Sequence, residues 1–480
     1  MHETYLIGID IGTGSTKAIA LSEKGTVLAK AQQFYSTISE GEKSEQEVFP
    51  VLNAFQQCIR QIVDQMQAAP VAVSLSSAMH SILAVDENGK PLTNAILWSD
   101  TRSSGIAESL RTSAEGVPIY HNTGTPLHSM SPLCKIAWLR QYEPQIFSRT
   151  AKFISIKEFI WHQLFREYVI DHSLASATGL FHIVNLGWDE TALCYAGIDA
   201  RKLSTPVPVM YTRKGLSDAD AAAMKLPAET HFLIGGSDGC LANLGSLCLQ
   251  PSKAAITIGT SAAVRVTTAV PVQQADRMIF NYLLNETTFV CGGAVNNGGN
   301  VFQWLLENLF QQHASVSNYD QLFALLDKVP AGSEGLLFLP YLHGERAPVW
   351  DEKSCGVYIG MRSVHTLPYF ARAAAEGVCL ALLHILASLE EVCGTIEEIA
   401  VSGGVVQSNE MMQLLADVTG KTVLVQQSED ASAIGAAYLA QRALGIINDF
   451  TSLVSAPDSV FRPQKEKTDL YQKLFSIYKG

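Results

Sequence analysis

A short stretch near the start of the chain carries the residue types that bind phosphate groups. An apolar run ends in Asp10, and the turn Gly12-Thr13-Gly14-Ser15 follows it. Glycines can adopt φ > 0 and let a ligand approach the backbone. The N–H groups of the turn and the hydroxyls of Thr13 and Ser15 can then bind phosphate oxygens, and Asp10 can face the same phosphates through a Mg²⁺ ion and its waters. An ordinary tight hairpin with an aspartate at the end of its first strand is the alternative interpretation.

The pattern around this turn predicts a β-hairpin, because an apolar run precedes it and the run from Thr16 to Leu21 alternates like a strand. A second copy of the pattern lies near the middle of the chain. There, residues 255–258 precede Gly259 and Thr260, and another alternating run follows. Two strand–Gly-Thr–strand units half a chain apart predict a duplicated architecture. In such an architecture each half offers one hairpin to a single nucleotide.

A second carboxylate follows another glycine turn. The apolar run 231–234 leads into Gly235 and Gly236, and then into Ser237 and Asp238. An aspartate at the end of a parallel-type strand is placed to point into a cleft, although it can also serve as a helix N-terminal cap. The same stretch satisfies the G-x-S-x-G pattern of serine hydrolases, with Ser237 as the nucleophile. Against that hypothesis, the chain has no His-Gly-Gly-Gly oxyanion segment, and both Gly-Thr hairpins stay unexplained.

Two further predicted strands end in residues suited to binding a sugar. Met79 and His80 follow the first strand closely, and Trp98 and Arg102 lie at the end of the next. The simpler interpretation is packing plus a surface histidine. In the functional interpretation, His80 forms hydrogen bonds with hydroxyl groups and Trp98 provides a flat apolar face.

Composition excludes several other classes of protein. The 480 residues favour two domains, and the net charge of −12 argues against nucleic acid as the main partner. The nine cysteines include no C-x-x-C pair, which fits reduced thiols in a cytoplasm. The first strand begins too close to Met1 for a signal peptide, and the apolar run 378–389 is too short to span a bilayer. We therefore expect a cytoplasmic protein with neither nucleic acid nor membrane as partner.

In the types and order of these motifs, the chain resembles the FGGY family of carbohydrate kinases, within the actin-like ATPase fold. The resemblance runs from Tyr5 to about Arg442 and includes a signature-like segment that matches the family pattern over Met130–Leu139 and departs from it at its last position, Tyr142. It implies an α/β fold with two actin-like (ribonuclease H-like) lobes and a central ATP cleft. The lobes are expected at 1–247 and 252–445, with a mostly helical tail at 446–480.

The resemblance also implies the cofactors and the site. ATP is the phosphoryl donor, Mg²⁺ lies near Asp10, and Asp238 is the general base that accepts the proton of the attacking hydroxyl. The residues expected to bind the nucleotide are Thr13, Gly14, Ser15, Lys17, Gly259, Thr260, Gly299, Gln303, Gly404 and Asn409. The residues expected to bind the sugar are Gly12, Met79, His80, Trp98, Arg102 and Asp238.

Within the family, the motif set is most similar to that of gluconate kinases, and another sugar or polyol such as xylulose is the alternative substrate. A linear sugar acid needs a cation or amide donors at its carboxylate. The nearest cationic candidates are Arg102, His128, Lys135 and Lys157, and the sequence does not choose between them. An actin-like nucleotide switch is the non-enzymatic alternative, but assembly proteins do not need a sugar-binding edge. The expected partner is a small sugar or sugar acid, with a homodimer as the candidate assembly.

Overall fold

The computed structural model describes residues 3–425, 430–450, 453 and 457–479. The chain forms two compact units. The first unit contains Met1–Leu247, Ala269–Val290 and Asp430–Val454, and the second contains Cys248–Thr268, Cys291–Glu429 and Ser455–Gly480. The units are therefore discontinuous in sequence. The reason is that the helix α15 (Ala431–Ala443) packs within the first unit, and the tail returns to the second.

The first unit is built on a six-stranded sheet in the order β14-β15-β6-β1-β2-β3. Strands β1, β2 and β3 are antiparallel neighbours, whereas β6 runs parallel to both β1 and β15. The bounds of these strands are Tyr5–Ile11 (β1), Ser15–Ser22 (β2), Val27–Phe34 (β3), Ala72–Ser77 (β6), Thr212–Arg213 (β14) and His231–Ser237 (β15). The hairpin β1–β2 was predicted from the sequence and is confirmed.

Helix α1 (Val48–Met66) covers one face of this sheet, as the helical spacing of its apolar residues predicts. Val51, Phe55, Ile59 and Ile62 are fully buried and form the core together with the apolar side chains of β1 and β6. This packing anchors β1 and so fixes the position at which the chain turns after Ile11.

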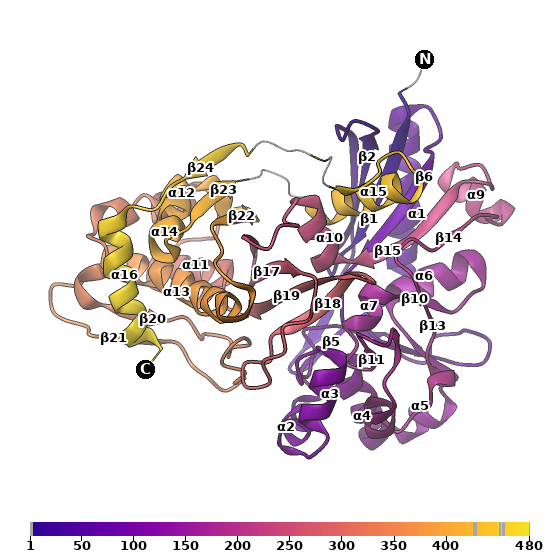
Figure 1. The fold of residues 1–480 in the computed structure, drawn as a ribbon, viewed down its shortest axis with the longest axis horizontal. Helices are drawn as coiled ribbons and strands as arrows, with labels where there is room; N and C mark the ends of the chain where they lie inside the picture. Colours follow the sequence, from indigo (N-terminus) through magenta and orange to yellow (C-terminus); the bar gives the residue numbers. More distant parts are fainter. Residues whose placement is uncertain (1–2, 426–429, 451–452, 454–456, 480) are drawn as a thin grey trace. The chain divides into compact units, whose positions relative to one another are not determined.

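A pair of glycines lets two helices of the first unit approach each other closely. In α10 (Asp238–Gly245), a Cβ on Gly245 would lie 2.0 Å from the carbonyl oxygen of Ala431. In α15, a Cβ on Gly435 would lie 1.9 Å from the carbonyl oxygen of Leu241. The two backbones are in contact, and α15 also lies against β1 and β6 (Figure 1). Helix α10, which begins at Asp238, is therefore held in place by a segment from near the end of the chain.

The second unit repeats the strand order of the first. Its sheet contains the strands β19-β17-β16-β22-β23-β24 in this order, and the first five correspond one by one to β3-β2-β1-β6-β15. Strands β16 and β17 form an antiparallel hairpin, and β22 runs parallel to β16, as β6 does to β1. This agreement confirms the duplicated architecture. The bounds are Lys253–Ile258 (β16), Ala262–Thr268 (β17), Thr288–Val295 (β19), Glu398–Ser402 (β22), Thr422–Val425 (β23) and Ser459–Phe461 (β24).

The long helix α13 (Leu367–Cys393) lies in the core of the second unit. Among the described residues it alone has the length and apolar composition of a membrane span, and 83% of its most apolar window is buried inside the protein. That burial is typical of a core helix. The apolar run 378–389 is thus part of a longer helix than the sequence suggested, because the alanines at 373–375 continue it towards its N-terminus. Glu376 accepts a hydrogen bond from Tyr471 of α16 (Lys465–Tyr478), which attaches the tail to this core.

The remaining elements used below surround the two sheets. In the first unit these are β7 (Leu83–Val85), β8 (Ala95–Ile96), β9 (Lys152–Ile154), β18 (Phe280–Asn285), α2 (Ser104–Thr112), α4 (Pro132–Tyr142), α6 (Ile156–Phe165) and α7 (His172–Ser176). In the second unit they are β20 (Leu337–Leu339), β21 (Val357–Ile359), α11 (Gly299–Trp304), α12 (Val316–Phe323) and α14 (Asn409–Thr419).

Candidate active site

The turn between β1 and β2 is held in place by side chains from other segments. Tyr35 donates its hydroxyl proton to the carbonyl of Gly12 at 2.7 Å, and Gln46 donates to the carbonyl of Thr13 at 2.8 Å. The indole N–H of Trp98 donates to the Thr13 hydroxyl at 3.2 Å, so this oxygen keeps its own proton for a further acceptor. A Cβ on Gly14 would meet no atom within 4 Å, so the space beside the turn is open. The turn is rigid on its protein side and accessible on the other, which suits an anion-binding loop.

The carboxylate of Asp10 lies at the end of β1 and accepts a hydrogen bond from the Ser76 hydroxyl at 2.8 Å. Loss of water around this partly buried group, and then the negative charge of Asp238, raise its pKa to about 7. Lys17 and the Ser76 hydroxyl act in the opposite direction. Two carboxylates that repel each other in a poorly hydrated site form an environment that a divalent cation stabilises.

The donor set here suits Mg²⁺ bound in part by a substrate. Within the described part of the chain, no group of three or more His, Cys, Asp or Glu side chains is arranged to hold a metal ion. Mg²⁺ is usually bound through one or two carboxylates, with waters and substrate phosphates supplying the other ligands. Asp10, directly before a phosphate-binding type of turn, matches that pattern.

Asp238 owes its position to the glycine turn before it. Gly235 has φ 69°, and a Cβ there would lie 1.7 Å from the carbonyl oxygen of Leu75, so only glycine fits. The register of β15 against β6 shifts between Leu233 and Gly236. Asp238 is the first residue of α10, and the residue in the N-cap position is Ser237, which makes no side-chain cap. Asp238 is therefore not the N-cap residue of α10, and its Oδ1 accepts a hydrogen bond from the backbone N–H of Gly239 at 2.7 Å.

The serine hydrolase hypothesis for Ser237 is wrong. Its side chain is fully buried, and its hydroxyl forms a hydrogen bond with the Ser173 hydroxyl at 2.9 Å. Its backbone is in the ordinary extended region, with φ −76° and ψ 150°. A nucleophile elbow instead needs an exposed hydroxyl on a strained turn.

Lys17, which the sequence assigned to the nucleotide, lies beside an aspartate from the far end of the chain. Its Nζ is 3.6 Å from Asp430 Oδ1, and Lys30 Nζ is 2.7 Å from Asp430 Oδ2. Asp430 directly precedes α15, and its charge also raises the pKa of Asp10. Neither Asp430 nor Ser76 was singled out from the sequence. Asp430 has no local motif, and Ser76 is one serine among several at the end of β6.

Both the backbone conformation and the ring orientation of His80 are fixed by its surroundings. Its φ is 67°, in the left-handed region, and its Nδ1 lies 2.8 Å from the carbonyl oxygen of Ala177. A carbonyl oxygen can only accept, so Nδ1 carries the proton and Nε2 of the neutral ring is an acceptor. The Tyr282 hydroxyl lies 3.4 Å from Nε2. Met79 beside it is half-buried. The predicted sugar-binding edge is therefore a fixed structure in which the histidine ring has one defined tautomer.

The structure separates the four cationic candidates. Arg102 donates to both Asp100 and Glu45, and Lys157 forms a fully buried ion pair with Asp171 at 2.6 Å. The Nδ1 of His128 accepts a hydrogen bond from the backbone N–H of Met130. The ammonium group of Lys135 contacts the carbonyl oxygen of His80 at 2.7 Å. Two of the four cations are thus already neutralised by carboxylates of the protein.

The second hairpin, in the second unit, carries a loop on its turn. The backbone N–H of Gly299 donates to the carbonyl of Gly259 at 2.7 Å, and the N–H of Asn300 donates to the carbonyl of Thr260 at 3.2 Å. A Cβ on Gly299 would lie 2.7 Å from the carbonyl oxygen of Gly259, so the loop needs glycine to come this close. The structure therefore brings Gly259, Thr260 and Gly299 together.

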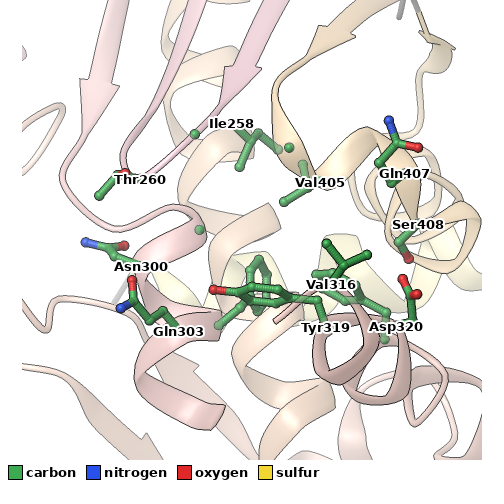
Figure 2. A pocket seen from close by; sticks show the side chains of 15 residues that line it. Ile258, Thr260, Asn300, Gln303, Val316, Tyr319, Asp320, Val405, Gln407 and Ser408 are labelled. Atoms are coloured by element: carbon green, nitrogen blue, oxygen red, sulfur yellow. The ribbon is translucent and has the colours of Figure 1, made fainter. Parts of the chain in front are cut away.

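A pocket of about 370 Å³ opens beside this hairpin and has a size typical of small-ligand sites. Figure 2 shows the Tyr319 ring facing Ile258 and Val405, with its hydroxyl toward the side that carries Asn300 and Gln303. The lining is mainly apolar and includes a few polar side chains. The lining residues are Ile258, Gly259, Thr260, Gly299, Asn300, Phe302, Gln303, Val316, Tyr319, Asp320, Phe323, Gly404, Val405, Gln407 and Ser408.

Four residues of this pocket were predicted to bind the nucleotide in addition to Thr260, namely Gly259, Gly299, Gln303 and Gly404. Asn409, which was also expected to bind the nucleotide, begins α14 and does not line the pocket. The aromatic and apolar residues of α12 were missed, because the segment 311–325 carries no motif that distinguishes it from a surface helix.

Both halves of the chain match domains of one known protein family. Residues 5–245 match the N-terminal domain of the FGGY family of carbohydrate kinases, and residues 254–444 match its C-terminal domain. The chain belongs to the FGGY family of carbohydrate kinases. It is therefore a carbohydrate kinase with two domains of the actin-like fold.

This FGGY kinase is similar to gluconate kinases and, at lower identity, to a xylulose kinase. A gluconokinase from Bacillus licheniformis is 38% identical and aligned over 99% of this chain and 95% of its own length. A xylulose kinase from Staphylococcus epidermidis is 28% identical over 100% of this chain and 97% of its own. A crystal structure of gluconate kinase from Lactobacillus acidophilus superimposes with a TM-score of 0.94 at 30% identity, covering 99% of this chain and 97% of that one.

Proposed function

We propose that this FGGY kinase transfers the γ-phosphoryl group of ATP to the terminal hydroxyl of D-gluconate and releases 6-phosphogluconate. The observation that carries the reaction class is the pair of carboxylates, Asp10 and Asp238, beside the open turn Gly12–Ser15. The choice of gluconate is supported by the greater identity to a gluconokinase than to a xylulose kinase, 38% against 28%.

In this proposal the two Gly-Thr hairpins bind the phosphates of ATP, and the apolar pocket lined by Tyr319, Val316 and Val405 binds its base. Asp10, positioned by Ser76, holds Mg²⁺ through the ion's waters. When bound, ATP with Mg²⁺ supplies an activated phosphoryl group and neutralises the charge that develops during transfer. Phosphoryl transfer needs little covalent chemistry from the protein, so positioning and electrostatics account for most of the rate.

Asp238 is the proposed general base. It lies at the end of β15 as a half-buried carboxylate, and the proton of the attacking hydroxyl moves to one of its Oδ atoms. The repulsion between Asp238 and Asp10 that raises the pKa of Asp10 is relieved when a cation binds near Asp10. Substrate and metal binding are therefore expected to support each other.

His80 and Trp98 are proposed to bind the acceptor. The Nε2 atom of His80 is the acceptor of the ring, because Nδ1 carries the proton, and a substrate hydroxyl takes the place at Nε2 that the Tyr282 hydroxyl occupies at 3.4 Å. Trp98 packs beside the turn through its bond to Thr13 and presents its ring to the apolar face of the sugar chain. Arg102, which follows Trp98 in the sequence, has its charge balanced by Asp100 and Glu45, which suits a role as a hydrogen-bond donor.

The experiment that tests this function is identification of the product. The protein is incubated with ATP, Mg²⁺ and D-gluconate, and the product is analysed by ³¹P and ¹³C NMR. We expect one phosphate ester, with phosphorus coupled to C6. A product phosphorylated elsewhere, or no product from gluconate beside turnover of D-xylulose, would contradict the proposal. The Asp238→Asn variant is the matched negative control.

We also propose a cytoplasmic location and a homodimeric assembly. All nine cysteines are described and are thiols rather than disulfides, which supports a cytoplasmic location. Apolar residues are exposed on β21 and just after it, with Val357 at 44%, Ile359 at 46% and Met361 at 67%. Exposed apolar residues along a short strand favour association with another chain. We propose a homodimer, and light scattering of the wild type against Ile359→Lys tests it.

A further inference from the structure

Lys135 is a buried cation to which the proposed mechanism gives no role. It lies in α4, its side chain is 1% exposed, and its Nζ donates to the carbonyl oxygen of His80 at 2.7 Å. Among the residues that the structure describes, no carboxylate lies within ion-pair distance of this Nζ. A buried ammonium group without a counter-charge is costly, so it is expected only where it serves a purpose.

The groups around Lys135 lower its pKa. Burial lowers its pKa to about 7, and the charge of Asp100 opposes this shift only in part. The carboxylate of Asp100 already accepts hydrogen bonds from Arg102. The guanidinium group of Arg102 stacks on Trp138, which lies in α4 like Lys135, with its Cζ 4.7 Å from the ring centroid. The charge of Asp100 is therefore already balanced by Arg102, and the carbonyl oxygen of His80 is the direct partner of Lys135.

The contact falls on the most constrained residue of the predicted sugar edge. His80 has φ 67°, which non-glycine residues rarely adopt, so its turn needs support from its surroundings. Ala177 and Tyr282 hold the two ring nitrogens. Lys135 holds the backbone carbonyl from a third direction, because it reaches the turn from α4. Ser81, the next residue, is also fixed, since its hydroxyl accepts from the backbone N–H of Ile156.

We propose that Lys135 is a positioning residue for acceptor binding: its ammonium group fixes the carbonyl of His80 and so aims the His80 ring at the acceptor. This inference rests on the proposed function insofar as His80 is placed in the acceptor site. Removing the ammonium group frees the carbonyl, lets the left-handed turn relax and rotates the ring away from the direction that Ala177 and Tyr282 define.

The test uses four variants of the full chain. Lys135→Met removes the donor at similar volume, Lys135→Arg keeps a cation, and Lys135→Ala leaves space that propylamine can fill. Lys152→Met is the matched control. Lys152 also donates to backbone carbonyls, but these belong to Arg201 and Leu203 and not to the turn that contains His80. Steady-state kinetics are measured for ATP and for both acceptors, D-gluconate and D-xylulose.

We expect Lys135→Met to raise the KM for the acceptor about tenfold or more while the KM for ATP stays within twofold. Propylamine should restore at least a third of the lost kcat/KM to Lys135→Ala, and Lys152→Met should resemble the wild type. An unchanged acceptor KM in folded Lys135→Met would overturn the proposal. So would a loss for gluconate much larger than that for xylulose, because that result indicates direct contact between Lys135 and the substrate carboxylate.

A second readout separates this inference from the proposed function. The ¹⁵N NMR signals of the His80 ring, assigned with His80→Asn, report its tautomer without any substrate. In the wild type Nδ1 should carry the proton, and Lys135→Met, or Lys135→Arg where the former does not fold, should shift the ring signals towards a mixture of tautomers. Unchanged signals would overturn the positioning role. If the wild type phosphorylates neither acceptor, but the Lys135 variant still shifts the His80 ring signals, the proposed function is contradicted and the positioning role is supported.

Discussion

Asp10 and Asp238 stand on opposite sides of one central strand. Asp10 is paired in register with Ser76 of β6, and Gly236, two residues before Asp238, is paired with the same serine. Because β1 and β15 both run parallel to β6, their carboxyl ends meet at one edge of the sheet. The charge of Asp238 consequently raises the pKa of Asp10. The topology of the sheet thus creates the electrostatics of the site.

Replacing Asp238 by asparagine should leave a folded protein that binds nucleotide but has lost most of its turnover. The amide cannot accept the proton of the acceptor hydroxyl, and general-base catalysis contributes about 10²–10⁴-fold. Measurement of kcat together with ATP binding by calorimetry checks this. Ser237→Ala is the neighbouring control and should keep substantial activity. Normal turnover by Asp238→Asn would remove Asp238 from the mechanism.

The stability of the metal-free protein should fall as pH rises from about 4 to 7. The pKa of Asp10 is raised to about 7 in the folded chain, so in this range the folded state holds a proton that the unfolded state has released. The free energy of unfolding should therefore decrease with pH by at most about 4 kcal/mol, since one unit of pKa is worth about 1.4 kcal/mol. Above pH 7 this contribution is constant.

Asp10→Asn should remove that dependence, because the amide does not ionise. Urea unfolding in chelator at pH 5 and pH 8 should show the variant more stable than the wild type at pH 8 and much closer to it at pH 5. Asp276→Asn, which changes an exposed carboxylate of the same unit, is the control and should follow the wild type. A wild type and an Asp10→Asn variant with the same pH profile would show that Asp10 has an ordinary pKa.

Both Gly-Thr hairpins should contribute to nucleotide binding. Thr13→Ala and Thr260→Ala each remove a hydroxyl from a turn proposed to bind phosphates, and each should raise the KM for ATP about ten- to hundredfold, in line with the loss of a hydrogen bond to a charged group. Thr112→Ala, on the exposed end of α2, is the control. If one hairpin variant keeps the wild-type KM for ATP, the duplicated site is not used in that half.

The pocket beside the second hairpin should bind the base mainly through Tyr319. Tyr319→Ala removes a ring that faces Ile258 and Val405 and should weaken ATP binding at least tenfold, with the KM for the sugar unchanged. Asn409→Ala serves as the comparison, because Asn409 lies outside the pocket lining. A larger effect from Asn409→Ala would restore the assignment made from the sequence and count against Tyr319.

Features that depend on neighbouring residues were predictable from the sequence. The two hairpins follow from alternating apolar runs around glycine turns, and helix α4 begins at Pro132 with Ser131 as its cap, two residue types that favour a helix start. The strand that ends before Asp238 was recognisable from its apolar run and two glycines. Each of these features is coded within about ten residues.

Features that depend on distant contacts were not predictable. The return of α15 to the first unit, and with it the ion pairs of Lys17 and Lys30 with Asp430, joins residues about 400 positions apart. Likewise, the sequence offered Lys135 as one of four cations, and only the fold shows that it contacts His80 while Lys157 is paired with Asp171. No local pattern encodes such pairings, because they result from packing between separate elements.

The most direct test of the account is a comparison of kcat/KM for D-gluconate, D-xylulose, glycerol and sorbitol under one set of conditions. A site that binds a carboxylate rejects uncharged analogues, because its own polar groups are then left without partners. D-gluconate should exceed each of the other three by well over tenfold, a difference of more than about 1.4 kcal/mol in transition-state binding. Equal or better turnover of D-xylulose would contradict the assignment of gluconate as substrate.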